Sequence, residues 1–145
     1  FTENFETTNG FSAWDKKNGT VGKSTGADAY AGTYGGYLKS VAYAQKKVST
    51  ADKTGIHLKY ARKLAGPATG NCLYVEWRPD GTAEPLASGW NLLEAVPSTA
   101  TGWVYVDLTC PAGANGQSNF TIQFRGGVNN NSEYAYIDNI EVTGN

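Results

Sequence analysis

The stretch Glu133–Val142, EYAYIDNIEV, decides the fold of this chain. Its aromatic and β-branched residues suit a pleated sheet. In its middle stand Asp138 and Asn139, where an ordinary strand carries another apolar pair. Asp and Asn are depleted in strands, and their oxygens are good ligands for a hard cation. The segment therefore predicts a closing β-strand that either binds a cation through Asp138 or ends in a β-bulge with a solvated carboxylate.

Length and charge limit the class of protein. The 145 residues fit one domain, which can bury about 70% of its unfolded surface. The 12 basic and 13 acidic side chains leave a net charge of −1, so the basic excess expected of a nucleic-acid binder is missing. The sequence contains no apolar run of about 20 residues, so no membrane helix is predicted. The many Gly and Tyr, the few charges and the lack of Met are typical of a secreted module cut from a longer protein.

The two cysteines, Cys72 and Cys110, lie far apart in the sequence. Zinc sites bring paired Cys or His close together along the chain, so the spacing predicts no zinc site. In a secreted protein the two cysteines either form one disulfide bond or remain two buried free thiols. The residues alone leave both alternatives open.

Short alternating segments separated by Gly, Pro, Asn and Asp run along the whole chain, which predicts an all-β protein. The best helical candidate, Val41–Lys53, is interrupted by β-branched and short polar residues. There is no internal repeat or linker, so residues 1–145 are expected to form one domain. The expected strands are Thr2–Thr7, Phe11–Lys16, Tyr37–Ser40, Gln45–Ser49, Gly55–Leu64, Cys72–Arg78, Trp90–Ala95, Trp103–Thr109, Phe120–Arg125 and Ala135–Val142.

Side chains alternate between the two faces of each long strand. One face is apolar and predicts the core, and it carries Ile56, Leu58, Tyr60, Leu73, Val75, Trp77, Val104, Val106, Leu108, Phe120, Ile122 and Phe124. Trp14 also falls on an apolar phase. Trp90 follows Ser88-Gly89 and is expected to be either a loop platform or a lid.

The opposite faces of the same strands combine flat rings with hydrogen-bonding head groups. If the strands share a sheet, its outer face suits a sugar, because rings stack on apolar C–H faces while Arg and Glu bind pairs of hydroxyls. The predicted binding residues are Tyr74, Glu76, Arg78, Tyr105, Gln123 and Arg125, with Trp103 and Lys59 at the margin.

Several short motifs follow one another in an order similar to that of a known family. They are Asn4-Phe-Glu6 followed by Phe11 and Trp14, then Tyr30-Ala-Gly32 with Gly36-Tyr-Leu38, Ile56-His-Leu-Lys-Tyr60, Leu73-Tyr-Val-Glu-Trp77 with Asp80-Gly81, Gly102-Trp103, Phe120-Thr-Ile-Gln-Phe-Arg125 and Tyr134–Val142. Together they resemble the galactose-binding-like and MAM-like β-jelly-roll modules, which include many carbohydrate-binding modules. The resemblance covers almost the whole chain and implies a jelly-roll β-sandwich of two antiparallel sheets. It specifies the ligand poorly, because this scaffold serves binding, adhesion and structural roles.

The resemblance also implies a structural calcium ion between the first and the last strand. Transferred to this chain, its ligands are Glu6 and Asp138, with Asp28 and backbone carbonyls as further candidates. Calcium takes six to eight oxygen ligands, so carboxylates from distant segments suit it. Such an ion would fasten both ends of the domain.

Catalytic patterns are weak in this sequence. The single histidine, His57, stands mid-strand near lysines, and there is no Gly-x-Ser-x-Gly motif. Glycoside hydrolysis needs two carboxylates about 5–10 Å apart. Glu76 and Asp107 could meet only if their strands are neighbours, and Asp138 and Glu141 face opposite sides of one strand. The chain is therefore predicted not to be an enzyme.

Two functions remain open. The first is a monomeric, non-catalytic carbohydrate-binding module of a secreted polysaccharide-degrading enzyme, bound to a polysaccharide or oligosaccharide and attached to a catalytic domain. The second is a structural or protein-contacting accessory domain of a larger extracellular protein, in which the aromatic face is an interface between domains.

Overall fold

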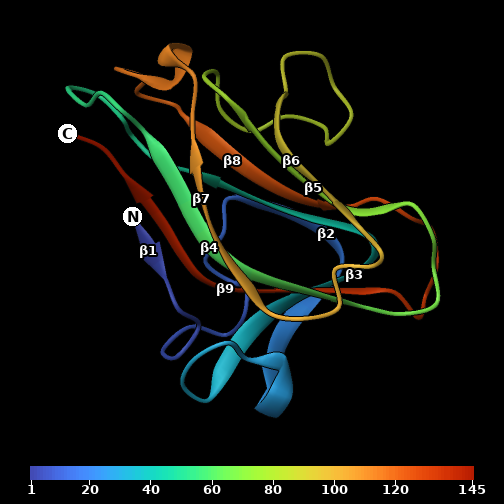
Figure 1. Cartoon of the computed structure of the whole chain (residues 1–145). Helices are drawn as coiled ribbons and strands as arrows, with labels where there is room; N and C mark the ends of the chain where they lie inside the picture. The colour runs from blue at the N-terminus through green and yellow to red at the C-terminus, as the bar shows by residue number, and fades with distance from the viewer.

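A computed structural model describes all residues, 1–145, as an antiparallel all-β domain (Figure 1). None of its helices is long and apolar enough to cross a membrane. The strands are β1 (Thr2–Glu3), β2 (Lys16–Thr25), β3 (Tyr34–Lys47), β4 (His57–Ala65), β5 (Asn71–Arg78), β6 (Asn91–Pro97), β7 (Val104–Thr109), β8 (Thr121–Gly126) and β9 (Tyr134–Thr143), and the short 3₁₀ helices are η1 (Gly26–Asp28) and η2 (Ala112–Ala114).

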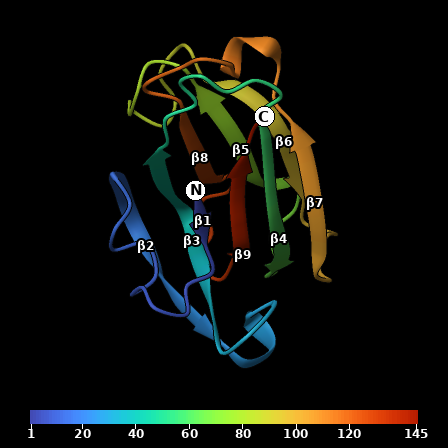
Figure 2. The same cartoon turned by 90° about the vertical axis from the view of Figure 1, so that its left-hand side faces the viewer.

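The strands form two layers that share the long strand β3. The hydrogen-bonded order is β6-β5-β8-β3-β9-β4-β7, with β2 on β3 and β1 on β9. Residues 43–47 of β3 pair with β8, whereas residues 36–39 pair with β9. Between them Ser40 has a left-handed backbone, φ 59°, and β2 shifts register between Asn18 and Thr20. Figure 2 shows β2, β3, β9, β4 and β7 in front of β8, β5 and β6. The predicted jelly-roll sandwich is confirmed, with its two sheets joined through β3.

One hydrophobic core fills the space between the layers. The alternation predicted its members correctly in β4, β5 and β8, where Leu58, Val75 and Ile122 are fully buried. Trp14 and Trp77 are core residues as well. Val104 is 45% exposed because β7 is an edge strand that pairs only with β4.

The sequence prediction was wrong at the N-terminal third of the chain. Residues 11–15 form a turn rather than a strand, in which the ring of Phe11 packs on those of Phe5 and Trp14, and Lys16 already belongs to β2. Strand β2 was not predicted, because it pairs only with β3 and carries few apolar residues. The two strands expected over 37–49 are one continuous strand, β3.

The closing strand β9 lies in the layer that also contains β4 and β7. It pairs with β4 on one side and with β3 and β1 on the other. Its register shifts against β4 where Asn139 adopts φ 47°, which makes the β-bulge that was one of the two expectations. The carboxylate of Asp138 beside the bulge is fully buried, not solvated.

The two cysteines are buried free thiols, so the disulfide alternative is wrong. Burial raises the pKa of both Cys72 and Cys110 to about 11. A thiol needs to ionise to react, so these two are inert core residues near neutral pH.

Candidate functional site

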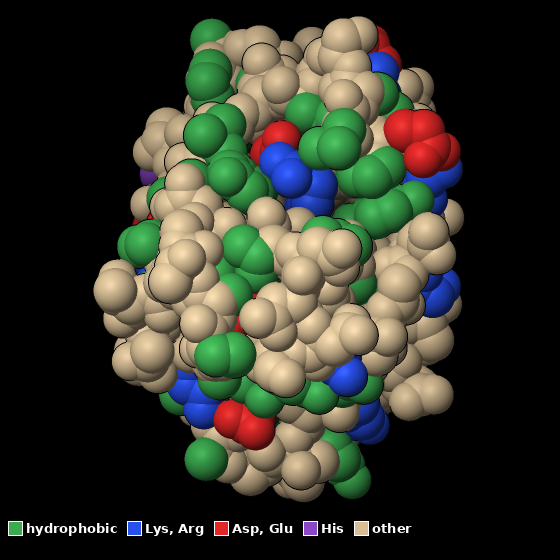
Figure 3. Space-filling model, turned by 90° about the vertical axis from the view of Figure 1, so that its right-hand side faces the viewer, with side chains coloured by type: hydrophobic (Ala, Val, Ile, Leu, Met, Phe, Trp, Pro, Cys, Tyr) green, Lys and Arg blue, Asp and Glu red, His purple; other side chains and the backbone are tan.

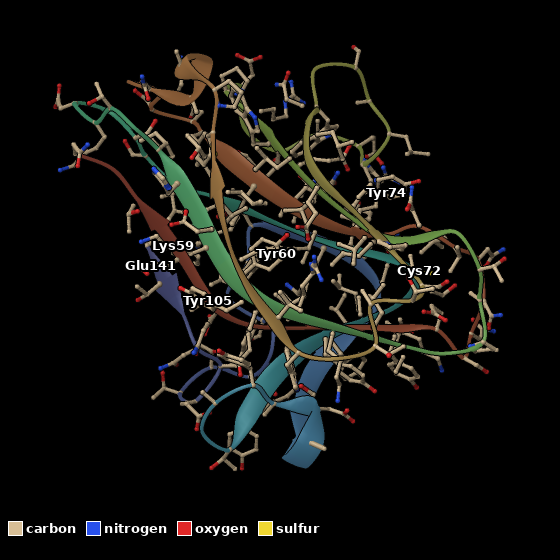
Figure 4. All side chains as sticks on the ribbon, viewed as in Figure 1. Lys59, Tyr60, Cys72, Tyr74, Tyr105 and Glu141 are labelled. Atoms are coloured by element: carbon tan, nitrogen blue, oxygen red, sulfur yellow. The ribbon has the colours of Figure 1, made fainter.

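The eight predicted binding residues lie on opposite sides of the sandwich. The first face is the outer surface of β3, β8 and β5, and it carries five of them: Tyr74, Glu76, Arg78, Gln123 and Arg125. The second face is the outer surface of β3, β9, β4 and β7, and Lys59, Tyr105 and Trp103 belong to it. Figure 4 shows Tyr74 well apart from Lys59 and Tyr105. The single shared face expected from the sequence is therefore not formed.

Strand register places the first-face residues in two rows across the sheet. One row aligns Tyr74 of β5 with Arg125 of β8, and Arg125 with Tyr43 of β3. The next aligns Glu76 with Gln123, and Gln123 with Gln45. Side chains opposite each other on one face lie within contact distance, so each row is continuous.

The second row is a buried hydrogen-bond network. The Nε of Arg125 and the Nε2 of Gln123 both donate to Oε1 of Glu76, at 2.9 and 3.1 Å. The Oε1 of Gln123 accepts from Nε2 of Gln45 at 2.6 Å. Both glutamines are fully buried and Glu76 is 8% exposed. Satisfied networks of this kind fix side-chain positions, because breaking one leaves buried polar groups without partners.

A loop, residues 79–90, covers part of this face. Gln45 holds it with two hydrogen bonds, donating from Nε2 to the carbonyl of Ala83 at 2.7 Å and accepting from the Ala83 N–H at 3.2 Å. Gln123 donates to the carbonyl of Pro85 at 3.2 Å. Sequence reasoning missed Gln45, because one polar residue in an alternating strand looks like any solvated position.

A cavity of about 430 Å³ remains between the loop and the sheet. Its walls include Tyr43, Pro85, Leu86 and Arg125, and Leu86 is 79% exposed at its rim. The guanidinium of Arg125 lies 4.3 Å from the centre of the Tyr74 ring. Seen from this side, Figure 3 shows basic and acidic side chains gathered in a hollow with hydrophobic side chains around it.

Trp90 and Arg78 brace the loop and do not line the cavity. The Trp90 Nε1 donates to the carbonyl of Glu84 at 2.9 Å, and the Arg78 guanidinium lies 5.6 Å from the Trp90 ring. Arg78 also lies 3.8 Å from the carboxylate of Asp80. Trp90 was expected to be either a loop platform or a lid, and the structure supports neither role. Its indole stabilises the 79–90 loop from within.

The predicted residues of the second face have other partners. Lys59 lies 4.0 Å from Asp107. Tyr105 stacks on Tyr30 with 6.1 Å between ring centres. The Trp103 Nε1 donates to the carbonyl of Ala27 at 3.0 Å, so this indole fastens the η1 loop.

Two of the three expected calcium ligands, Glu6 and Asp138, hold the same backbone segment. The Oδ2 of Asp138 accepts the backbone N–H groups of Tyr30 and Ala31, and Oε1 of Glu6 accepts those of Thr33 and Tyr34. Both carboxylates thus hold the 30–34 segment to opposite ends of the chain.

The fit to a cation follows from the surroundings of these carboxylates. Burial raises the pKa of Asp138 above its ordinary value, its backbone hydrogen bonds offset part of that rise, and the charge of Glu6 adds to it. A cation between the two carboxylates would relieve both effects, so Glu6 and Asp138 remain candidate ligands, although both already accept backbone N–H groups. Asp28 does not fit a cation, because its Oδ1 pairs with Nζ of Lys63 at 2.7 Å. No cluster of three or more His, Cys, Asp and Glu side chains is present, so further ligands would be carbonyls or water.

The carboxylates that could have formed a catalytic pair are separated. Glu76 belongs to the first face, where it is bound by Arg125 and Gln123. Asp107 belongs to the second face, with Oδ1 2.6 Å from Nδ1 of His57. Glu76 and Asp107 therefore cannot act on one glycosidic bond.

Comparison with known proteins identifies the fold. No family model and no curated protein matches the sequence. Among solved structures, the K1 cleaved adhesin domain of Lys-gingipain from Porphyromonas gingivalis W83 aligns with a TM-score of 0.74 and 16% identity, over 100% of this chain and 98% of that one. The chain has the β-sandwich fold of carbohydrate-binding modules.

Two such modules align over nearly their whole length. A CBM61 module solved with β-1,4-galactotriose has a TM-score of 0.64 and 14% identity, over 98% of this chain and 94% of the module. The CBM22-1 xylan-binding domain of Xyn10C from Paenibacillus barcinonensis has a TM-score of 0.65 and 15% identity, over 99% of this chain and 92% of that domain. At these identities the likeness concerns the fold and leaves the ligand of this chain to its own residues.

Proposed function

We propose that this chain is a non-catalytic carbohydrate-binding module that binds a glycan in the first-face cavity. The supporting observation is the position of Arg125, held by Glu76 and stacked on Tyr74 beside a cavity of about 430 Å³. A cavity of this size lies within the ordinary range of ligand sites. The folds of the CBM61 and CBM22 modules make the same function reasonable.

The cavity offers two kinds of contact to a sugar. Tyr43, Pro85 and Leu86 present apolar surface to the C–H face of a pyranose ring. The guanidinium of Arg125 gives one N–H to Glu76, and its remaining N–H groups can donate to sugar hydroxyls. The side-chain amides of Gln45 and Gln123 are already hydrogen-bonded within the buried network and to the 79–90 loop. They therefore position the site and do not contact the ligand.

The charges of the first face are balanced, which favours a neutral sugar. Arg125 pairs with Glu76, Arg78 lies near Asp80, and Lys16 pairs with Glu84 at 3.0 Å. A carboxylate or sulfate entering the cavity would meet these acids as well as the bases. Neutral glycans such as β-1,4-galactan and xylan are therefore the first ligands to test.

The wider setting belongs to the same proposal. The module acts as a monomer attached to a catalytic domain of a secreted polysaccharide-degrading enzyme and holds that enzyme on its substrate. It performs no chemistry itself, since Glu76 beneath the cavity is engaged with Arg125 and Gln123, and Glu84 at its wall is paired with Lys16.

Affinity electrophoresis of the isolated chain against neutral plant, algal and bacterial polysaccharides tests the proposal. Wild-type protein should be retarded on at least one of them. Leu86→Ser should weaken that binding severalfold, and Arg125→Gln should weaken it at least tenfold. Lys53→Gln, an exposed substitution far from the cavity, is the control for lost charge and should bind normally. Retardation on none of the panel would reject the proposal and favour a structural or protein-contacting domain.

We also propose that calcium binds between Glu6 and Asp138 and fastens the termini. At a calcium concentration of 100 times Kd, binding adds about 2.7 kcal/mol to the free energy of unfolding, so chelation should lower the melting temperature by several degrees. Glu6→Gln keeps an acceptor oxygen for Thr33 and Tyr34 but removes the charge, and its melting temperature should no longer respond to calcium. The matched control is Glu141→Gln in the same layer. A wild-type melting temperature that ignores calcium after chelation would rule out this site.

A further inference from the structure

The second face carries a cluster of tyrosines that the first-face site does not use. Tyr37 of β3 lies opposite Tyr136 of β9, and Lys39 lies opposite Tyr134. The rings of Tyr134 and Tyr136 are parallel, with 5.8 Å between centres and an interplanar angle of 3°. The Tyr37 ring meets Tyr134 edge-on at 5.7 Å. We name Tyr37, Lys39, Tyr134 and Tyr136 the tyrosine patch.

These rings are not core residues. All three tyrosines are half-buried, and they border a hollow of about 300 Å³ with Lys23, Ser24, Thr25 and Asp28 of the β2–η1 segment. Gly22 of β2 gives room to one ring, since a Cβ at that position would lie 2.8 Å from Tyr37. The backbone thus leaves space for a ring laid across the sheet, and the volume is at the lower end of ligand sites.

The charge of the patch differs from that of the first face. Neither Lys39 nor Lys23, which borders the hollow, has a carboxylate within 4.0 Å, and each ammonium lies over a tyrosine ring instead. Lys39 is 5.6 Å from the centre of Tyr134 and Lys23 is 3.7 Å from that of Tyr34. Lys63 beside them is neutralised by Asp28. Lys23 at the hollow and Lys39 beside it therefore have no acid partner, while the carboxylate of Asp28, which also lines the hollow, is paired with Lys63.

We propose that the tyrosine patch is a second glycan site and that it takes acidic saccharides. A sugar ring placed against Tyr37 and Tyr134 finds phenol hydroxyls as hydrogen-bond partners. The carboxylate or sulfate of the sugar then lies within reach of Lys39. Lys39 forms no ion pair that would have to break on binding. Aromatic surface without a nearby cation would serve a neutral sugar equally well, and unpaired lysines supply the preference for a negative charge. The two faces would then bind different parts of a mixed polysaccharide.

The test presents two acidic polymers, one carboxylated and one sulfated, to the intact chain. Affinity electrophoresis and calorimetry with polygalacturonate, which carries carboxylates, and with carrageenan, which carries sulfates, identify the source of the charge. Retention on either polymer is expected for the wild type. Lys39→Gln should weaken it at least fivefold and Tyr134→Ala at least tenfold, with unchanged melting temperatures.

Two control variants and a mass measurement make the outcome decisive. Lys53→Gln removes an equal charge outside the patch and should bind as the wild type does. Arg125→Gln should lose neutral-glycan binding and keep acidic-glycan binding, so a failure of the first-face site leaves this test intact. If neither polymer is retained, or if Lys53→Gln weakens binding as much as Lys39→Gln, the patch is not a specific acidic-glycan site. A doubled mass in sedimentation that Tyr134→Ala abolishes would also overturn the proposal, because it would assign the patch to self-association.

Discussion

The two outer faces of one sandwich handle charge in opposite ways. On the first face, Arg125, Glu76 and Gln123 are tied to one another beneath a loop, and each cation has an acid partner. On the second face, the ammonium of Lys39 lies over the half-buried ring of Tyr134 and has no acid partner. The first arrangement couples binding to stability, because its groups are buried. On the second face the affinity for a ligand can change independently of the free energy of unfolding, since substitutions of its side chains leave the core packing intact.

The largest expected effect is on the first face, where Glu76→Ala leaves the buried cation of Arg125 and the amide of Gln123 without an acceptor. The side chains of Arg125 and Glu76 are 17% and 11% exposed. Breaking a pair this buried should lower the free energy of unfolding by about 3 kcal/mol, or the melting temperature by about 8 °C. Urea denaturation measures the change.

Asp80→Ala provides the matched control for Glu76→Ala. Its side chain is 72% exposed beside Arg78, so its loss should change stability by less than about 0.5 kcal/mol. Equal effects of the two substitutions would show that the first-face network does not stabilise the fold, and the contrast between the faces would disappear.

Salt should separate the two faces next. Exposed charges are screened over about 10 Å at 0.1 M ionic strength. Raising NaCl from about 50 to about 500 mM should therefore weaken acidic-glycan binding severalfold and neutral-glycan binding less than about twofold. Calorimetry at both salt concentrations measures the two affinities. An equal response of both ligands would place them on the same face.

The smallest expected effect is a pH dependence of stability from Tyr136. Burial raises the pKa of Tyr136 to about 12, and the charge of Asp28 adds to the rise. An unfolded phenol ionises near pH 10, so between about pH 10 and 12 the unfolded chain releases a proton that the folded chain keeps. Stability is therefore lost as pH rises through this window.

Tyr136→Phe should remove this contribution from the pH dependence. Urea denaturation at about pH 9 and about pH 11.5 should show a smaller loss of stability for Tyr136→Phe than for the wild type. The comparison with the variant cancels the titration of the other tyrosines and of the lysines. Parallel losses would mean that Tyr136 is as solvated as an unfolded tyrosine, and the tyrosine patch would have to be redrawn.

Much of the fold could be predicted because strands carry a local signal. The alternation of Leu73, Val75 and Trp77 in β5, and of Ile122 and Phe124 in β8 with Phe120 just before it, gave the core faces correctly. The signal fails where burial is one-sided or local, as in β2, whose exposed polar residues look like a loop. The calcium ligation expected of Glu6 and Asp138 came from a family resemblance and stays a prediction, whereas the structure shows that both carboxylates accept hydrogen bonds from the 30–34 segment.

The binding residues divide along the same line. Tyr74 and Arg125 were placed on one face by their phases, and the structure confirms that they lie side by side. Tyr105 has the same phase but belongs to the opposite layer, because β7 pairs with β4. Gln45 and the 79–90 loop had no sequence signal, since their contacts are long-range.

The sequence by itself determined where the strands of the second half lie and which side of each faces the core. Side-chain alternation depends only on the two-residue repeat of a strand. Tertiary structure alone decided which strands share a layer, because pairing is set by long-range hydrogen bonds and by the bend of β3 near Ser40. That bend separates one predicted aromatic surface into two faces, one balanced in charge and one not. The stretch EYAYIDNIEV predicted the fold. Its two tyrosines form part of the tyrosine patch only because β9 pairs with β3.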